Sequence, residues 1–218
     1  MKRRNLPVAA TLAVTAALLL TACGGGDDGP EGNDKVPGAD TGDSTPSASP
    51  SSSAPDGAGR PNVILPNGVK DVFESWKTGD ATKDTVLADA ARARTALNYA
   101  ATQGNTKEPA LSFYWQGDAF LSAVNWVKWF TDHNSTYIGT IRYFDARVTV
   151  SSGSSAAVIY CSDESKAYNK DKKTQKVDKT ATTDKSYVLY NTHLEKSSKG
   201  VWETVGIVSK RGDKSCVQ

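Results

Sequence analysis

The chain has 218 residues, of which 23% are charged, and a formal net charge of +2 at pH 7. It contains no Gly-rich phosphate loop, no G-x-S-x-G sequence and no H-E-x-x-H sequence, so no motif supports a phosphate-binding protein, a serine hydrolase of that type or a zinc protease. The aromatic and basic pattern typical of single-strand binders is also missing, and nucleic acid is not an expected partner.

The first 23 residues form a basic start, an apolar run and a cysteine. Residues 2–4 are basic, and Val8–Leu20 is shorter than the roughly 20 apolar residues that a membrane-spanning helix needs. The run closes on Leu20-Thr21-Ala22-Cys23, which resembles the lipobox of bacterial lipoprotein signal peptides. The resemblance implies that residues 1–22 are removed, that the Cys23 thiol carries a diacylglycerol, and that the mature chain is anchored on the extracytoplasmic face of the cell membrane.

Two alternatives remain open for this segment. The first is an ordinary secretory signal in which the cysteine occurs by chance. The second concerns the export route, because Arg3-Arg4 followed by Leu6 resembles a twin-arginine signal, although Pro7 occupies a position where that signal prefers a bulky apolar residue. The sequence therefore does not decide between general secretory and twin-arginine export.

Residues 23–61 are predicted to be a disordered linker behind the lipidated cysteine. Gly, Ser, Pro, Ala, Asp and Thr dominate this segment, and Val36 is nearly its only aliphatic residue, so it buries too little apolar surface to offset the entropy of ordering. A flexible chain of this length has a root-mean-square reach of roughly 35 Å. Residues 62–218 are then expected to form a single globular domain.

The first half of that domain predicts helices. The spacing of Val69, Val72, Phe73 and Trp76 favours a first helix. A second helix has an apolar face of small residues from Val86 to Ala101, leaves Asp89 off that face, and stops at Gly104. A third helix is expected to begin near Asp118, and the segment Phe113-Tyr114-Trp115 before it is expected to be extended.

The second half predicts strands, each with one apolar face. From residue 143 to 150, one face carries Phe144, Ala146, Val148 and Val150, and the other carries Tyr143, Asp145, Arg147 and Thr149. Residues 151–154 predict a turn into a strand over 156–163, and residues 197–200 predict a turn between strands over 187–196 and 201–209. The expected fold class is α+β, with N-terminal helices packed on a curved, cone-like antiparallel sheet of about four strands.

This order of elements resembles the nuclear-transport-factor-2-like cone, a fold shared by ketosteroid isomerases, polyketide cyclases and non-enzymatic secreted domains. A second resemblance lies in the C-x-D-x-S sequence Cys161–Ser165, the late Trp202 and the C-terminal Cys216. Small cell-envelope lipoproteins of high-GC Gram-positive bacteria share this combination. It implies a Cys161–Cys216 disulfide, which would close a loop of roughly 55 residues and stabilise the fold by about 4 kcal/mol.

Cone-fold isomerases and cyclases place an acid–base pair in the mouth of the cone, and Asp145 with His193 is the conceivable pair in this chain. A simpler interpretation makes Asp145 the surface partner of Arg147, and His193 a half-exposed strand residue. Candidate pocket-lining residues are Tyr114, Trp115, Tyr143, Asp145, His193 and Trp202. We expect no catalysis, no cofactor and no metal, and His133 is interpreted as the end of a helix.

Lysines are concentrated between Lys166 and Lys185, within a domain that is mildly basic while the linker is acidic. A solvated, mobile loop is one interpretation. The other is a contact for an anionic surface, made by Lys170, Lys172, Lys173 and Lys176.

Three hypotheses for the domain remain open. The first is a non-catalytic binding or accessory module at the cell envelope, and the second is a cone-fold isomerase or cyclase that uses Asp145 and His193. The third is a structural spacer with a basic loop that contacts wall polymer. The expected partners are the membrane, through the lipid anchor, and a cell-wall polymer or an envelope protein.

Replacing Cys23 with Ser removes the thiol that the lipobox resemblance assigns to the lipid. We expect the Cys23→Ser chain to leave the membrane fraction and to stop incorporating labelled palmitate, as measured by fractionation and metabolic labelling of cells. Cys216→Ser, which leaves the lipobox intact, is the matched control. A Cys23→Ser chain that is still labelled would contradict the assignment.

Overall fold

A computed structural model describes residues 57–218 of the protein. The predicted signal peptide, Cys23 and the linker up to residue 56 lie outside the described residues. Among residues 57–218, no helix is both long enough and apolar enough to cross a bilayer.

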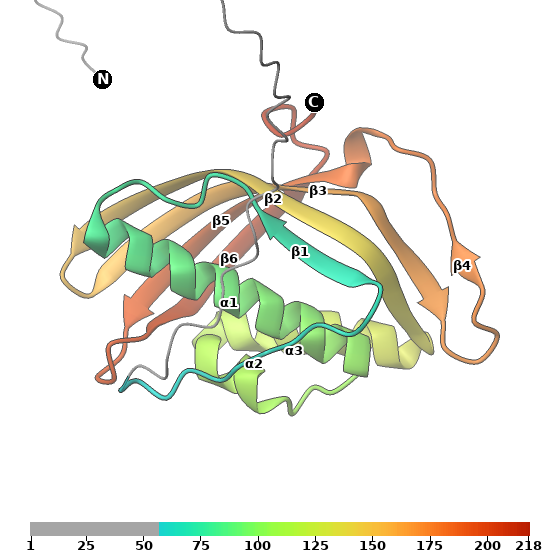
Figure 1. Cartoon of the computed structure of the whole chain (residues 1–218), viewed down its shortest axis with the longest axis horizontal. Coiled ribbons are helices and arrows are strands. Elements are labelled where there is room, and N and C mark those ends of the chain that lie inside the picture. The colour runs from blue at the N-terminus through green and yellow to red at the C-terminus, as the bar shows by residue number, and fades with distance from the viewer. Residues whose placement is uncertain (1–56) are drawn as a thin grey trace, which may run out of the picture. The chain divides into compact units, whose positions relative to one another are not determined.

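Three helices lie on one face of a curved sheet (Figure 1). The elements in chain order are β1 (Val69–Phe73), α1 (Ala81–Gln103), α2 (Pro109–Tyr114), α3 (Gly117–Asp132), β2 (Ser135–Ser152), β3 (Ser155–Asp171), β4 (Val177–Asp178), the 3₁₀ turn η1 (Asp184–Ser186), β5 (Tyr187–Lys196) and β6 (Trp202–Arg211). The sheet order is β1-β2-β3-β5-β6, with β4 paired to β3. The α+β class is confirmed, but the sheet has six strands and not about four. It is mixed and not antiparallel, because β1 runs parallel to β2.

Helix α1 follows the sequence signals closely. The Asp80 carboxylate accepts a hydrogen bond from the Lys83 N–H at 2.9 Å and caps the first turn. Gly104, with a φ of 66°, ends the helix in the left-handed conformation that glycine adopts without strain. Between these ends, buried alanines such as Ala96 and Ala100 let the helix pack closely in the core.

The predicted helix around Val69–Trp76 is wrong, because residues 69–73 form the edge strand β1. These residues pair in register with Gly139–Tyr143 of β2. At Gly139 a side chain would meet the Lys166 carbonyl oxygen at 1.9 Å, so only glycine fits where β1, β2 and β3 lie together. Five residues are too few to make a helix stable alone, and the strand pairing prevails over the apolar spacing.

The expected extended segment at residues 113–115 is also wrong for its first two residues. Phe113 and Tyr114 belong to α2, which has Pro109 in its first turn, a position where proline is tolerated in a helix. Trp115 is extended and forms an isolated bridge with Thr204.

Strand β2 changes the face that it presents to the core at a bulge. One extra residue lies between Phe144 and Arg147 relative to β3, and Asp145 has a φ of 52°. Tyr143 before the bulge and Ala146, Val148 and Val150 after it therefore all pack in the main core, whereas Phe144 packs with Cys161 on the other face of the sheet and does not share a face with Ala146. The prediction that Asp145 shares a strand face with Tyr143 is wrong, because simple alternation does not survive an inserted residue.

The lysine-rich segment is largely ordered. Strand β3 extends to Asp171, whose carboxylate accepts the backbone N–H groups of Lys173 and Thr174 at 2.9 and 2.6 Å. This turn leads into β4, which pairs back onto β3. Residues 166–185 therefore do not form a single loop, because parts of this segment belong to β3 and β4.

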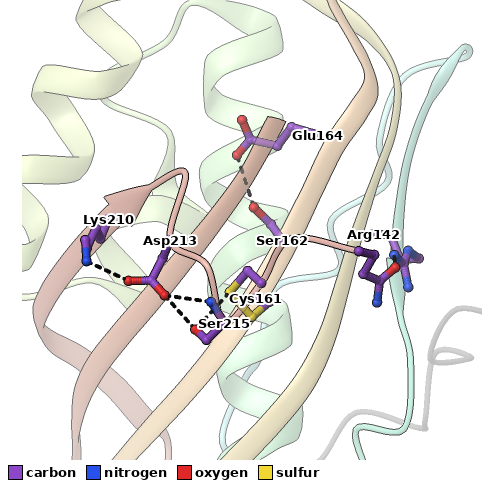
Figure 2. Close-up of a disulfide and its surroundings, with 9 residues drawn as sticks. Arg142, Cys161, Ser162, Glu164, Lys210, Asp213 and Ser215 are labelled. Carbon is purple, nitrogen blue, oxygen red and sulfur yellow. Dashed lines mark hydrogen bonds and ion pairs between the residues drawn. A yellow bond between two sulfur atoms is a disulfide. The ribbon is translucent and has the colours of Figure 1, made fainter. Parts of the chain in front are cut away.

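The predicted disulfide between Cys161 and Cys216 is confirmed, and their Cα atoms lie 5.5 Å apart (Figure 2). It lies on the outer face of the sheet with Phe144 and Tyr187, and it ties the C-terminal tail to the central strand β3. The tail is also held by Asp213, which accepts hydrogen bonds from the N–H and the hydroxyl of Ser215 at 3.0 and 2.7 Å. These bonds, together with Lys210, lower the pKa of Asp213 to about 2.

The C-x-D-x-S sequence alternates between the two faces of β3. On the outer face, Asp163 bonds to the Ser165 N–H at 2.9 Å and to Arg142 at 3.3 Å. Burial alone would raise the pKa of Asp163, but these donors outweigh it and hold the pKa below its ordinary value. On the inner face, the buried Ser162 hydroxyl donates to Glu164 at 3.2 Å (Figure 2).

Removing the disulfide tests how much the tail closure contributes. We expect Cys161→Ala with Cys216→Ala to lower the free energy of unfolding by about 4 kcal/mol, because the unfolded chain loses a loop closed over 55 residues. Urea unfolding with and without reductant measures this difference. Reductant should destabilise the parent and leave the double variant unchanged. A loss below about 1 kcal/mol in both comparisons would contradict the assignment.

Candidate functional site

A cavity of about 560 Å³ lies on the inner side of the sheet. Its lining comes from α1, α3, β2, β3, the segment between β4 and β5, and the end of β6. The lining includes charged, polar and aromatic side chains, among them Arg94, Asn98, Trp126, Tyr137, Glu164 and Arg211. A second hollow of about 300 Å³ shares Arg94, Trp126 and Arg211 with the first.

Arg94 brings a positive charge to the wall of both hollows. It projects from the buried part of α1 and is only 5% exposed. Its guanidinium lies 4.4 Å from the centre of the Tyr190 ring and 5.5 Å from that of Tyr143. Within residues 57–218 it forms no ion pair closer than 4.0 Å, and its buried Nε has no hydrogen-bond partner.

A buried polar network lies one helical turn from Arg94. The Asn98 side-chain amide donates to the Asp71 carboxylate at 2.8 Å and contacts the Tyr143 hydroxyl at 2.8 Å. Thr95 donates a further bond to Asp71 at 3.2 Å. Burial raises the pKa of Asp71 from 3.8 to about 6, although Asn98, Arg94 and Thr95 act in the opposite direction. Asp71 joins β1 to α1 and does not line either hollow.

Glu164 and Arg211 form an ion pair at the cavity wall. The Arg211 guanidinium lies 2.8 Å from the Glu164 carboxylate and also donates to the Lys185 carbonyl at 2.8 Å. The Tyr190 hydroxyl contacts the same carboxylate at 3.4 Å. Glu164 therefore already has its own cation, whereas Arg94 does not.

Apolar side chains of α3 form one wall of the cavity. Phe130 is buried, while Trp126 and Trp129 line the cavity and stay partly exposed, at 37% and 42%. Ile141 and Ala167 continue the apolar wall on the sheet side. The cavity therefore has an apolar wall, and it has a polar wall on the other side, where Asn169, Asp178, Thr180, Thr183 and Ser186 line it.

The predicted pocket-lining aromatic residues are mostly core residues. Tyr114, Tyr143 and Trp202 are fully buried and line neither hollow. Trp115 borders the smaller hollow, and its ring N–H donates to the Ala93 carbonyl at 2.8 Å.

The structure does not bring Asp145 and His193 together. Both are exposed, and His193 is in register, across β3, with Thr149, four residues beyond Asp145 on β2. Standard strand dimensions then separate them by about 10 Å across the sheet and about 13 Å along it. Asp145 borders a shallow surface hollow beside Arg142, and His193 contacts the Ser155 hydroxyl at 3.1 Å.

The four candidate lysines gather around the β3–β4 turn. Lys170 and Lys172 are half-buried, while Lys173 and Lys176 are exposed. The Lys172 ammonium reaches the Gln103 carbonyl at the end of α1, at 3.5 Å. His133 caps the end of α3, as expected, and its ring nitrogen contacts the Trp129 carbonyl at 2.8 Å.

Sequence reasoning did not select the polar cavity residues of α1, Arg94 and Asn98. Asp89 was expected off the apolar face of α1, yet it is fully buried, because it binds Arg60 at 2.7 Å, Arg92 at 2.9 Å and the Trp202 N–H at 3.0 Å. Arg94 and Asn98 interrupt the same run of small residues. Long polar side chains within an alanine-rich helix face could have indicated a buried polar site.

Among residues 57–218, no group of three His, Cys, Asp or Glu side chains is arranged to hold a metal ion. The side chains at the cavity offer hydrogen bonds and one unpaired guanidinium instead.

The fold and the cavity define an α+β domain whose curved sheet encloses a hollow together with its helices. No protein-family model matches the sequence, and no curated protein matches it.

Solved structures show a distant likeness. A ketosteroid isomerase-like protein from Erwinia carotovora atroseptica is 16% identical over 58% of this chain and 93% of its own, with a TM-score of 0.39. The intermembrane space region of the chloroplast protein ARC6 is 12% identical over 62% and 98%, with a score of 0.41. A candidate ketosteroid isomerase from Shewanella frigidimarina is 11% identical over 60% and 98%, with a score of 0.30. Values at this level transfer no activity, ligand or partner to this chain.

The raised pKa of Asp71 predicts a pH dependence of stability. The folded state holds a proton on Asp71 up to a pH of about 6, whereas the unfolded chain releases it near 3.8, so stability falls as the pH rises through this window. We expect a loss on the order of 2 kcal/mol between pH 4.5 and 6.5 that Asp71→Asn removes.

Urea unfolding at several pH values measures this slope. The exposed carboxyl variant Asp145→Asn is the matched control and should retain it. Asp163 and Asp213, whose pKa values are lowered, act in the opposite direction and below this window. An unchanged slope in Asp71→Asn would contradict the burial argument.

Proposed function

We propose that this protein is a lipid-anchored, extracytoplasmic binding protein whose domain holds a small apolar molecule in the inner cavity without altering it chemically. The observation that carries the proposal is the cavity of about 560 Å³, which falls within the usual range for ligand sites. Its walls combine aromatic side chains from α3 with polar groups from α1, β3, the segment from β4 to β5, and the end of β6.

The placement of the ionisable side chains favours binding over catalysis. Asp145 and His193 lie apart on the sheet surface, where no cavity encloses both of them. At the cavity wall, Glu164 is engaged by Arg211, and Asp71, which Asn98 binds, lies outside the cavity. General acid–base chemistry needs a group within hydrogen-bond reach of the reacting atom, and these arrangements leave the cavity with a recognition surface.

The proposed lipid anchor is supported by the lipobox resemblance at residues 20–23. A chain held at the membrane surface by acyl groups would present this domain to lipids and other apolar molecules, which are concentrated there. We therefore infer that the ligand is an amphiphile or an apolar metabolite of the cell envelope.

Binding of the neutral fluorescent probe N-phenyl-1-naphthylamine tests the proposed function. We expect saturable binding of one probe per chain, followed by probe fluorescence and by quenching of Trp126 and Trp129. Ala167→Trp fills the apolar wall of the cavity and should weaken binding at least 10-fold. Val208→Trp introduces the same side chain at a position that is 71% exposed and lines neither hollow, and should leave binding unchanged.

Two results would contradict the proposal. One is the absence of saturable probe binding. The other is equal binding by the parent, Ala167→Trp and Val208→Trp, because the probe would then occupy the protein surface. Thermal melting of both variants verifies that they are folded.

A further inference from the structure

We propose that Arg94 anchors the carboxylate of an apolar monocarboxylate bound in the cavity. The inference rests on the proposed function and adds the chemical class of the ligand. Arg94 is buried, faces the cavity and forms no ion pair within 4.0 Å among the described residues.

Arginine stays protonated in proteins, so Arg94 carries a full positive charge into the interior. Burying an unpaired charge is costly unless a partner compensates it. The other arginine at this wall, Arg211, forms an ion pair with the Glu164 carboxylate. The Tyr190 and Tyr143 rings hold the Arg94 guanidinium in position but contribute only weak, neutral attraction.

The neighbouring unpartnered groups match an oxygen acceptor. The buried Nε of Arg94 and the buried hydroxyl of Tyr137 have no hydrogen-bond partner, and both residues line the same cavity. Each of these groups donates a hydrogen bond. A carboxylate accepts several, and its two oxygens fit the planar fork of a single guanidinium.

The surrounding charges favour a monoanion over a doubly charged phosphate. Glu164 lines the same cavity, and Asp71 lies close enough to Arg94 to interact with it electrostatically. A second negative charge on the ligand would face these carboxyls and Asp178, against the Arg94 guanidinium and the single ammonium of Lys185. Lys185 at the cavity wall supplies a further positive charge that would attract an anion.

The remaining wall determines the body of the ligand. Trp126, Phe130 and Ile141 present apolar surface to the cavity, and burial of an alkyl or aromatic body there would supply most of the affinity. The carboxylate would then fix the orientation. A carboxylate head on Arg94 and an alkyl or aromatic body against this apolar wall describe a fatty acid or a similar apolar acid.

Decanoate and decan-1-ol form a matched pair of probes that differ only in the charged head group. We would titrate each, below the micelle concentration of decanoate, into the full chain carrying Cys23→Ser and purified under oxidising conditions. Isothermal titration calorimetry and quenching of Trp126 and Trp129 report the affinity. We expect decanoate to bind one per chain and at least 10-fold more tightly than decan-1-ol.

Variants at Arg94 separate the anchor from the cavity. Arg94→Met should weaken decanoate about 10- to 100-fold, the effect of losing hydrogen bonds to a charged group, and should leave decan-1-ol binding unchanged. Arg94→Lys keeps the charge but loses the fork, so its loss should be smaller. Arg147→Met removes an exposed arginine that lines neither cavity hollow, and it should bind decanoate as the parent does.

The outcomes distinguish the inference from the proposed function. Equal affinity for decanoate and decan-1-ol, or an unchanged decanoate affinity in Arg94→Met, would overturn the anchor while the cavity remains a binding site. Displacement of decanoate by millimolar inorganic phosphate would overturn the carboxylate class. No binding of either probe, together with no binding of N-phenyl-1-naphthylamine, would overturn both. If Arg94→Met does not fold, the decanoate to decan-1-ol ratio of the parent decides the matter alone.

Discussion

Among the buried polar side chains of helix α1, Asp89, Arg94 and Asn98 organise the rest of the domain through the way in which each is compensated. Asp89 is neutralised by Arg60 and Arg92 and accepts the Trp202 N–H, which joins the first described residues and the last hairpin to the helix. Asn98 binds Asp71 and Tyr143, which fixes the edge strand β1 and the central part of β2 against the same helix. Arg94, between them, has aromatic neighbours and an open cavity. Breaking either of the first two connections would leave a buried polar group unsatisfied, which is among the largest destabilising effects in proteins.

The shape of the sheet explains why a cavity exists beside Arg94. Phe144 packs on the disulfide at the outer face, and the bulge at Asp145 brings Ala146 and Val148 to the inner face that Tyr143 occupies before it. A second shift in register, between Thr140 and Arg142, follows Gly139, where β1, β2 and β3 lie close together. Bulges bend and twist long strands, so β2 and β3 curve around the helices without packing flat on α3. The disulfide and the Arg142 contacts with Glu74, Asp163 and Gln218 hold the opposite face of this curved region.

Local sequence signals predicted the elements that depend on local physics. The end of α1 at Gly104, the strand over residues 187–196 and the turns at residues 151–154 and 197–200 follow from capping, alternation and turn chemistry. The edge strand β1 and the bulge at Asp145 were missed because long-range strand pairing decides them. The Cys161–Cys216 pair followed from a resemblance to other proteins, and the structure confirmed it.

The candidate site was harder to predict than the fold. Sequence reasoning selected aromatic residues such as Tyr114 and Trp202, which turned out to be core residues, and it selected Asp145 and His193 by a face assignment that the bulge invalidates. Arg94 was not selected, because a single arginine within an alanine-rich helix normally indicates a solvated face. Its burial depends on the neighbours that β2, β5 and α3 bring to it, and these contacts appear only once the chain is folded.

A crystal structure of the protein with decanoate would test the central claim most directly. The account predicts electron density for the alkyl chain between α3 and the sheet, with both carboxylate oxygens about 2.7–2.9 Å from the Arg94 guanidinium, the usual length of a charge-assisted hydrogen bond. An empty cavity in which Arg94 has closed onto Glu164 or Asp71, or decanoate bound with its carboxylate away from Arg94, would contradict it.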